Sequence, residues 1–90
     1  MDFGLSGKVA MVSAASQGLG RACAAALAAE GARVAILSRR QDELDRVAGE
    51  IGAAAAVACD LADAGSITAA VARVRDELGP VSILVNNCGG

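Results

Sequence analysis

The chain alternates short apolar segments with longer segments in which apolar residues recur at helical spacing. The expected strands are Val9 to Ser13, Arg33 to Ser38, Ala54 to Cys59 and Val81 to Val85. They recur at intervals of roughly 25 residues, the length of one strand, one helix and their connections. Strands joined through helices in this way are parallel, because each helix carries the chain back along the sheet. The pattern therefore predicts an α/β fold with a parallel sheet.

The three segments between these strands are expected helices. The first runs from Leu19 to Glu30, and the third follows Asp63, whose side chain can cap a helix. The helices end at Gly31, Gly52 and Gly79, since glycine is the usual residue just past a helix. Right-handed crossovers then predict the strand order 3-2-1-4, with the first two helices on one face and the third on the other. This is the first half of a Rossmann-type, doubly wound sheet.

Composition limits the partners and the compartment. Phe3 is the only aromatic residue although 54% of the residues are apolar, so a core must be built from Ala, Val, Ile and Leu. A net charge of −2 with scattered basic residues does not favour nucleic acid as a partner. The cysteines are odd in number, far apart and without histidine, so neither a zinc site nor a disulfide framework is predicted. Free thiols, no signal-peptide pattern and no apolar run of membrane length predict a cytoplasmic protein.

The connection between the first strand and the first helix is rich in small residues. It reads Ser13-Ala14-Ala15-Ser16-Gln17-Gly18-Leu19-Gly20. Small residues let the backbone approach a phosphate group, while the free N–H groups and the dipole of the following helix attract its charge. A side chain at Gly18 or Gly20 would hold the phosphate away. The alternative is a plain turn with glycines for close packing, and the G-x-G-x-x-G pattern is not met because Cys23 takes its third glycine place.

Four landmarks spread over nearly the whole chain form a more specific pattern. They are Leu5-Ser6-Gly7-Lys8-Val9-Ala10, the turn that ends in Gly18-Leu19-Gly20, Cys59-Asp60-Leu61 and Asn86-Asn87-Cys88-Gly89. Together they resemble the short-chain dehydrogenase/reductase family, with 3-oxoacyl-carrier-protein reductases among the members that look closest. The family turn reads T-G-x-x-x-G-x-G, so Ser13 replaces its threonine and Ala14 its first glycine. The resemblance implies that residues 1–90 are the N-terminal part of a single NAD(P)-binding Rossmann domain.

The end of the second strand indicates which cofactor is bound. An acidic residue about 20 residues past the glycines would bind the ribose of NAD. Ser38 stands there and Arg39 and Arg40 follow, so a hydroxyl and a guanidinium would accept a 2′-phosphate, and NADP (NADPH) is favoured over NAD. Strand alternation makes Arg39 the better candidate of the two. The alternative is that both arginines are the solvated start of a helix, and Gln17 stands where NADP-using relatives often have a basic residue.

The resemblance implies roles for the remaining landmarks. Asp60 would accept a hydrogen bond from the adenine amino group near the Leu61 amide, although an aspartate there can equally form a turn. Asn86 would brace the central strands, and the backbone around Cys88 and Gly89 would line the nicotinamide ribose, unless this segment is a simple Asn-rich turn. The residues predicted to bind the cofactor are Ser13, Ala15, Ser16, Gln17, Gly18, Leu19, Gly20, Ser38, Arg39, Arg40, Asp60, Leu61, Asn87, Cys88 and Gly89.

The activity that the resemblance implies is that of an NADP-dependent oxidoreductase acting on CH–OH groups. Such an enzyme transfers hydride between NADPH and a ketone or secondary alcohol, using an Asn, a Ser and a Tyr-x-x-x-Lys motif. The sequence has no tyrosine and its only lysine is Lys8, so no catalytic residue is assigned and the 90-residue chain alone is expected to be inactive. The implied partners are a small carbonyl or alcohol substrate and, at full length, further copies of the protein, with no membrane.

Two other functions fit parts of the pattern. A methyltransferase-like Rossmann domain that binds S-adenosylmethionine also has a glycine-rich first turn, but it would normally carry an acid in place of Ser38. A non-catalytic nucleotide-binding module is the second alternative. The predicted strand order 3-2-1-4 would leave the fourth strand, Val81 to Val85, as an apolar edge without a neighbour. Such an edge is an aggregation hazard, and the 90-residue chain alone is expected to be marginally stable.

Overall fold

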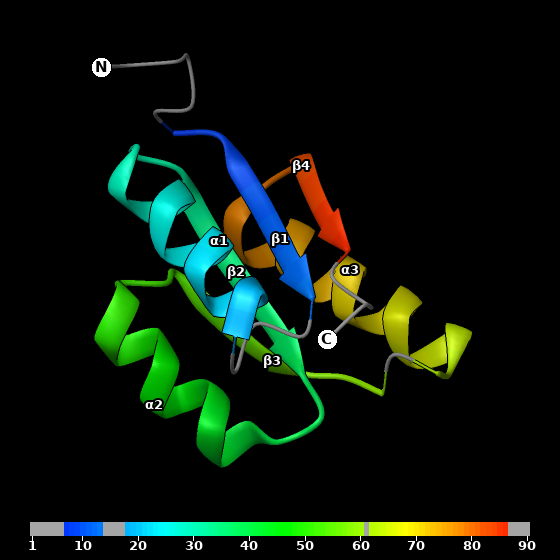
Figure 1. The fold of residues 1–90 in the computed structure, drawn as a ribbon. Coiled ribbons are helices and arrows are strands. Elements are labelled where there is room, and N and C mark those ends of the chain that lie inside the picture. Colours follow the sequence, from blue (N-terminus) through cyan, green and yellow to red (C-terminus); the bar gives the residue numbers. More distant parts are fainter. Residues whose placement is uncertain (1–6, 14–17, 61, 87–90) are drawn as a thin grey trace.

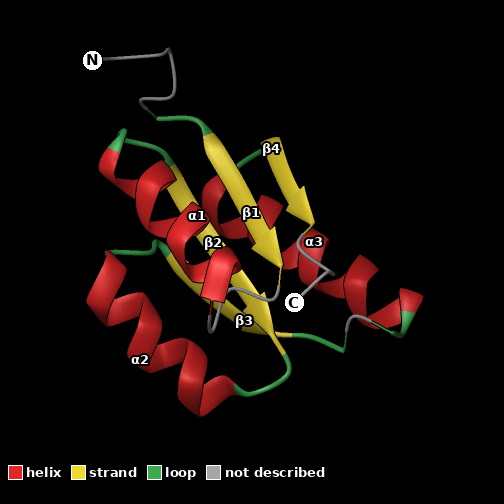
Figure 2. Ribbon diagram, viewed as in Figure 1, coloured by secondary structure: helices red, strands yellow, loops and turns green. Residues whose placement is uncertain are grey.

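The computed structural model describes residues 7–13, 18–60 and 62–86, and over these residues strands and helices alternate without exception (Figures 1 and 2). The predicted alternation is confirmed, and the predicted element ends differ from the observed ends by at most one residue. The elements are β1 (Val9–Ser13), α1 (Gly18–Ala29), β2 (Arg33–Ser38), α2 (Gln41–Ile51), β3 (Ala55–Ala58), α3 (Ala64–Leu78) and β4 (Val81–Asn86).

The described strands form one parallel sheet in the order β3-β2-β1-β4, which confirms the predicted order. All arrowheads in Figure 2 accordingly point to the same edge. At that edge Ser13 is aligned with Leu37 on one side and with Asn86 on the other, and Ser38 is aligned with Ala58. The carboxyl ends of β1, β2 and β3 therefore lie side by side.

Helices cover both faces of the sheet, as predicted (Figure 1). Successive residues of a strand point to opposite faces, so the inner residues of the central strands β1 and β2 are apolar and buried on both sides, and polar residues stand only at the strand ends. Each fully buried aliphatic side chain contributes about 1.5 to 3 kcal/mol relative to exposure. The core on the α1 and α2 face includes Val12, Val34, Ile36, Leu44 and Val47, and the core on the α3 face includes Met11, Leu37, Val57, Val74 and Leu78.

The helix ends show which of the predicted capping residues make hydrogen bonds there. Gly52 adopts a left-handed conformation with φ of 75°, and its N–H donates to the carbonyl of Ala48 at 3.0 Å, which confirms the predicted stop. Asp63 caps α3, since its carboxylate accepts the N–H of Gly65 at 2.9 Å. The N-cap of α2 is Arg40, which makes no side-chain cap hydrogen bond. None of the described helices has the length and apolar character needed to cross a membrane.

An ion pair joins the two helices that share a face. Arg21 in the first turn of α1 pairs with Glu50 in the last turn of α2. Arg46 lies on the same carboxylate group, with its guanidinium 3.6 Å from the second oxygen of Glu50. The two helices are also packed through the shared core on their face of the sheet.

β4 is the least covered of the described strands. It has β1 on one side and no described strand on the other. Leu84 is aligned with Met11 and therefore faces the α3 side, but α3 lies against β2 and β3 and leaves Leu84 68% exposed. The apolar edge predicted for the fourth strand is thus present in the structure.

Candidate functional site

The candidate site lies at the carboxyl edge of the sheet. Ser13 ends β1, Ser38 ends β2 and Asp60 follows β3, so parallel pairing brings three strand ends together. α1 is the next described element after β1 and begins at Gly18 (Figure 1). In doubly wound sheets ligands bind outside the carboxyl ends of the strands, where neighbouring connections diverge.

The first turn of α1 can receive an anion. The first N–H groups of a helix have no partner within it, and its N-terminus carries partial positive charge. Within the helix Gly18–Ala29 the first turn has no acidic residue, and Gly20 is buried there without a side chain. Arg21 completes the turn and is paired with Glu50. The turn therefore offers backbone donors that no carboxylate of its own competes for.

Ser13 ties two strands together beside this turn. It is 7% exposed, and its hydroxyl donates to the carbonyl of Val85 at 3.3 Å. The bond joins the end of β1 to the end of β4, two strands that are adjacent in the sheet but far apart in sequence. It fixes the strand end from which the small-residue connection begins.

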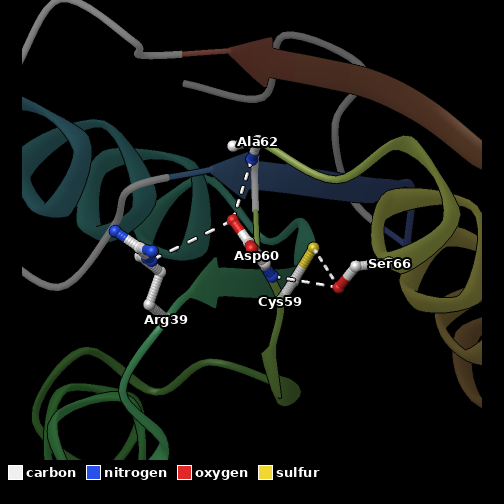
Figure 3. Close-up of polar contacts among 5 residues, drawn as sticks. All are labelled: Arg39, Cys59, Asp60, Ala62 and Ser66. Carbon is white, nitrogen blue, oxygen red and sulfur yellow. Dashed lines mark hydrogen bonds and ion pairs between the residues drawn. The ribbon is translucent and has the colours of Figure 1, made fainter.

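The two arginines after β2 differ in how their charge is compensated. Arg40 lies 3.7 Å from Asp42 and 3.9 Å from Glu43, both in the first turn of α2. Arg39 faces one carboxylate, with its Nε 4.0 Å from Oδ1 of Asp60, and its side chain is 75% exposed (Figure 3). Exposed ion pairs contribute about 1 kcal/mol or less. Arg39 is therefore the less compensated guanidinium and the more available to an added anion.

Asp60 is held in a turn and still presents an acceptor. One of its carboxylate oxygens, Oδ1, accepts the N–H of Ala62 at 3.0 Å, and its own N–H donates to the hydroxyl of Ser66 at 2.9 Å (Figure 3). The hydroxyl of Ser66 also lies 3.7 Å from Sγ of Cys59. The second carboxylate oxygen of Asp60 has no partner among the described residues. The turn-forming role and a ligand-accepting role are thus compatible in one side chain.

Gln41 is a contributor that the sequence analysis did not single out. Its amide nitrogen donates to the carbonyl of Ala56 at 3.3 Å and to Oδ1 of Asp45 at 2.7 Å. Its amide oxygen accepts the N–H of Ala58 at 3.2 Å. The β3 partners are 15 and 17 residues away in the chain, so no local motif marks these bonds. The sequence feature that could have identified Gln41 is an amide side chain at the first residue of a helix whose N-cap side chain makes no hydrogen bond.

Several predicted residues cannot be placed. Gly18, Leu19 and Gly20 form the start of α1, and Ser13, Ser38, Arg39, Arg40 and Asp60 lie at the carboxyl edge, so the structure brings this part of the predicted set together. The rest lie outside the described residues; they are Ala15, Ser16, Gln17, Leu61, Asn87, Cys88 and Gly89.

Comparison with known proteins decides the family. The model of the short chain dehydrogenase family matches residues 8–90. The chain belongs to the short-chain dehydrogenase family. This confirms the resemblance carried by the four landmarks, and it makes the methyltransferase-like alternative wrong.

Three similar proteins illustrate the family. D-threitol dehydrogenase of Mycolicibacterium smegmatis is 44% identical over 92 aligned residues, which cover 98% of this chain and 35% of that protein. The structure of L-sorbose reductase from Gluconobacter frateurii with NADPH and L-sorbose matches with a TM-score of 0.88 and 38% identity, over 100% of this chain and 36% of that one. The structure of 3-ketoacyl-(acyl-carrier-protein) reductase from Brucella melitensis with NADH matches with a TM-score of 0.83 and 43% identity, over 89% and 33%.

These matches cover only part of each relative. The chain spans about a third of the length of each relative. The matches confirm the Rossmann-type sheet of the short-chain dehydrogenase family in the order 3-2-1-4.

Proposed function

We propose that the chain is the NADP(H)-binding part of a short-chain dehydrogenase/reductase that interconverts a ketone and a secondary alcohol. Residues 1–90 would be the N-terminal part of one NAD(P)-binding domain. The observation that carries the proposal is Arg39, an exposed guanidinium 4.0 Å from Asp60, at the strand end where NAD-binding folds place an acid. The proposal assigns no catalytic residue to this chain.

The described residues fit a dinucleotide in three places. The first turn of α1, with buried Gly20 and no acid of its own, would donate N–H groups to the pyrophosphate. Arg39 and the hydroxyl of Ser38 would bind the 2′-phosphate, and Asp60 would accept a hydrogen bond from the adenine amino group. NADPH, once bound, supplies the hydride. What these residues do is hold the adenosine end and the phosphates at the carboxyl edge of the sheet.

The relatives support the reaction class but leave the cofactor open. One similar structure contains NADPH and another contains NADH, so membership of the family does not choose between them. The choice of NADP therefore depends on Arg39. The names of the relatives include a dehydrogenase of the polyol D-threitol and a reductase of the sugar L-sorbose, which supports a small alcohol or carbonyl compound as substrate. A cytoplasmic location and a homo-oligomer belong to the proposal, on the strength of the sequence and the family.

The proposal is tested by replacing Arg39→Ala in the complete gene product and titrating NADPH and NADH. Loss of a charge-assisted hydrogen bond should raise the Kd for NADPH roughly 10- to 100-fold, because such bonds contribute about 1.5 to 3 kcal/mol. The Kd for NADH should change less than about twofold, since NADH has no 2′-phosphate.

Arg73→Ala is the matched control, because Arg73 is an exposed arginine of α3 whose partner is Glu77 at 3.6 Å. It should leave both dissociation constants unchanged. Wild-type protein that bound NADH more tightly than NADPH would contradict the proposed cofactor.

A further inference from the structure

The connection from β2 to α2, which carries both arginines, is fastened to β3 by one side chain. We infer that Gln41 is a positioning residue for cofactor selectivity, which holds Arg39 where a 2′-phosphate would bind. The inference rests on the proposed function, because Arg39 must bind that phosphate for its position to matter. Gln41 itself would touch no part of the cofactor.

The start of α2 needs an anchor of this kind. Its N-cap residue, Arg40, is in an extended conformation with φ of −114° and ψ of 106°, and its side chain makes no cap hydrogen bond. Capping side chains usually fix the direction in which a chain enters a helix. The bond from the N–H of Leu44 to the carbonyl of Arg40 at 3.0 Å belongs to the helix and does not attach it to the sheet.

The amide of Gln41 supplies the missing attachment. It accepts from Ala58 at 3.2 Å and donates to Ala56 at 3.3 Å, so its two ends are bonded to complementary backbone groups of one strand. On the other side of Arg39, the N–H of Cys59 donates to the carbonyl of Ser38 at 2.7 Å. Arg39 therefore lies between two anchors, each of which ends on or directly after β3.

Asp45 fixes the orientation of the amide. Oδ1 of Asp45 accepts from the amide nitrogen of Gln41 at 2.7 Å, one helical turn further along α2. If the amide were reversed, its oxygen would face both this carboxylate and the carbonyl of Ala56. The reversed form would lose these bonds and place acceptors against each other. One orientation of Gln41 thus satisfies Asp45 and both groups of β3.

The anchor should affect selectivity more than binding as such. The side chain of Arg39 is 75% exposed and its guanidinium has a single distant carboxylate partner, so little except the backbone determines where it lies. A connection released from β3 would have to be ordered again when the phosphate binds, at a cost in conformational entropy. NADH lacks that phosphate and would not require the ordering.

The experiment compares Gln41→Ala with wild type in the complete gene product, by titration with NADPH and with NADH. The Kd for NADPH should rise about fivefold, in the range of one lost hydrogen-bonded contact, while the Kd for NADH changes less than about twofold. Thr68→Ala is the matched control, since Thr68 is an exposed polar residue of α3 whose hydroxyl bonds within its own helix, to the carbonyl of Ala64 at 3.0 Å. It should change neither constant.

A double variant shows whether Gln41 acts through Arg39. Arg39→Ala combined with Gln41→Ala should bind NADPH no more weakly than Arg39→Ala alone, because the anchor has nothing left to position. Asp45→Ala should shift the ratio of the two constants in the same direction as Gln41→Ala but by a smaller factor. Circular dichroism and thermal melting establish that each variant is folded, and if Gln41→Ala does not fold, the ratio measured for Asp45→Ala decides.

The two variants distinguish failure of the proposed function from failure of the inference about Gln41. An unchanged NADPH preference in Arg39→Ala would overturn the proposed function and this inference together. A changed preference in Arg39→Ala with an unchanged ratio in Gln41→Ala would overturn the inference alone. Equal weakening of NADPH and NADH by Gln41→Ala, or additive losses in the double variant, would give Gln41 a general structural role and would also overturn it.

Discussion

The two outer strands of the sheet, β3 and β4, are protected to different degrees. β3 is short, its inner residue Val57 is buried, and Gln41 bonds to its backbone near its end. β4 is longer, and among the described residues it has neither a second strand partner nor a helix over Leu84. An edge strand is protected when its backbone groups are bonded and its apolar face is covered. In β3 two backbone groups are bonded to Gln41 and Val57 is buried, whereas β4 leaves Leu84 exposed although Val81, Ile83 and Val85 pack against the two cores.

The largest expected effect separates a side chain buried against the sheet from the exposed side chain of β4. In the 90-residue chain, Leu44→Ala should reduce the free energy of unfolding by about 2 to 5 kcal/mol, because Leu44 is fully buried between α2 and the sheet. Leu84→Ala should change it by about 0.5 kcal/mol or less, since most of that side chain is already in water. Urea denaturation followed by circular dichroism measures both, and equal losses would show that Leu84 is packed.

A second expected effect concerns association through the uncovered strand. Leu84→Lys should raise the concentration at which the 90-residue chain self-associates about tenfold, equivalent to about 1.4 kcal/mol, because an exposed charge opposes pairing at an edge. Light scattering after size exclusion over a concentration series measures this. Ala58→Lys, at an exposed position on β3, is the control and should not change association. A wild-type chain that stays monomeric throughout would contradict the comparison.

The smallest effect is expected at the turn that follows the protected strand. Asp63→Ala removes the carboxylate that accepts the N–H of Gly65 at 2.9 Å and should destabilise the chain by about 1 kcal/mol. Arg40→Ala, at the uncapped start of α2, should have an effect of about 0.5 kcal/mol or less. Thermal unfolding of the two variants side by side tests this, and a larger loss in Arg40→Ala than in Asp63→Ala would contradict the expected ranking.

Local periodicity was enough to predict most of the fold. Strand and helix burial repeat over neighbouring residues, so the elements, the strand order and the faces that the helices cover could all be predicted from the sequence. The sequence pattern extends the third strand over Ala54 to Cys59, whereas β3 runs from Ala55 to Ala58, one residue shorter at each end. The N–H of Ala58, the last residue of β3, bonds to the side chain of Gln41, a helical residue that strand propensity does not mark.

The candidate site was predictable in position but not in detail. Glycines, serines and arginines at strand ends indicate a carboxyl-edge site, because parallel topology gathers those ends. The contacts that hold the site join distant residues, as in the bond from Ser13 to Val85, 72 residues away, and leave no local trace. The difference between Arg39 and Arg40 follows from Asp42 and Glu43, which stand two and three residues after Arg40 and pair with it.

The pairing of Arg21 with Glu50 makes α2 a rigid link between α1 and β3. One end of this helix is joined to the first turn of α1 by an ion pair, and the other end is hydrogen-bonded to β3 through Gln41. A helix advances about 1.5 Å per residue and hardly stretches, so the length of α2 sets the spacing of its two attachments. In the proposed function, a dinucleotide would reach from the first turn of α1 to Arg39. The separation of these two points would be set before binding, so the site would be preorganised and little binding free energy would be lost in rearranging the protein.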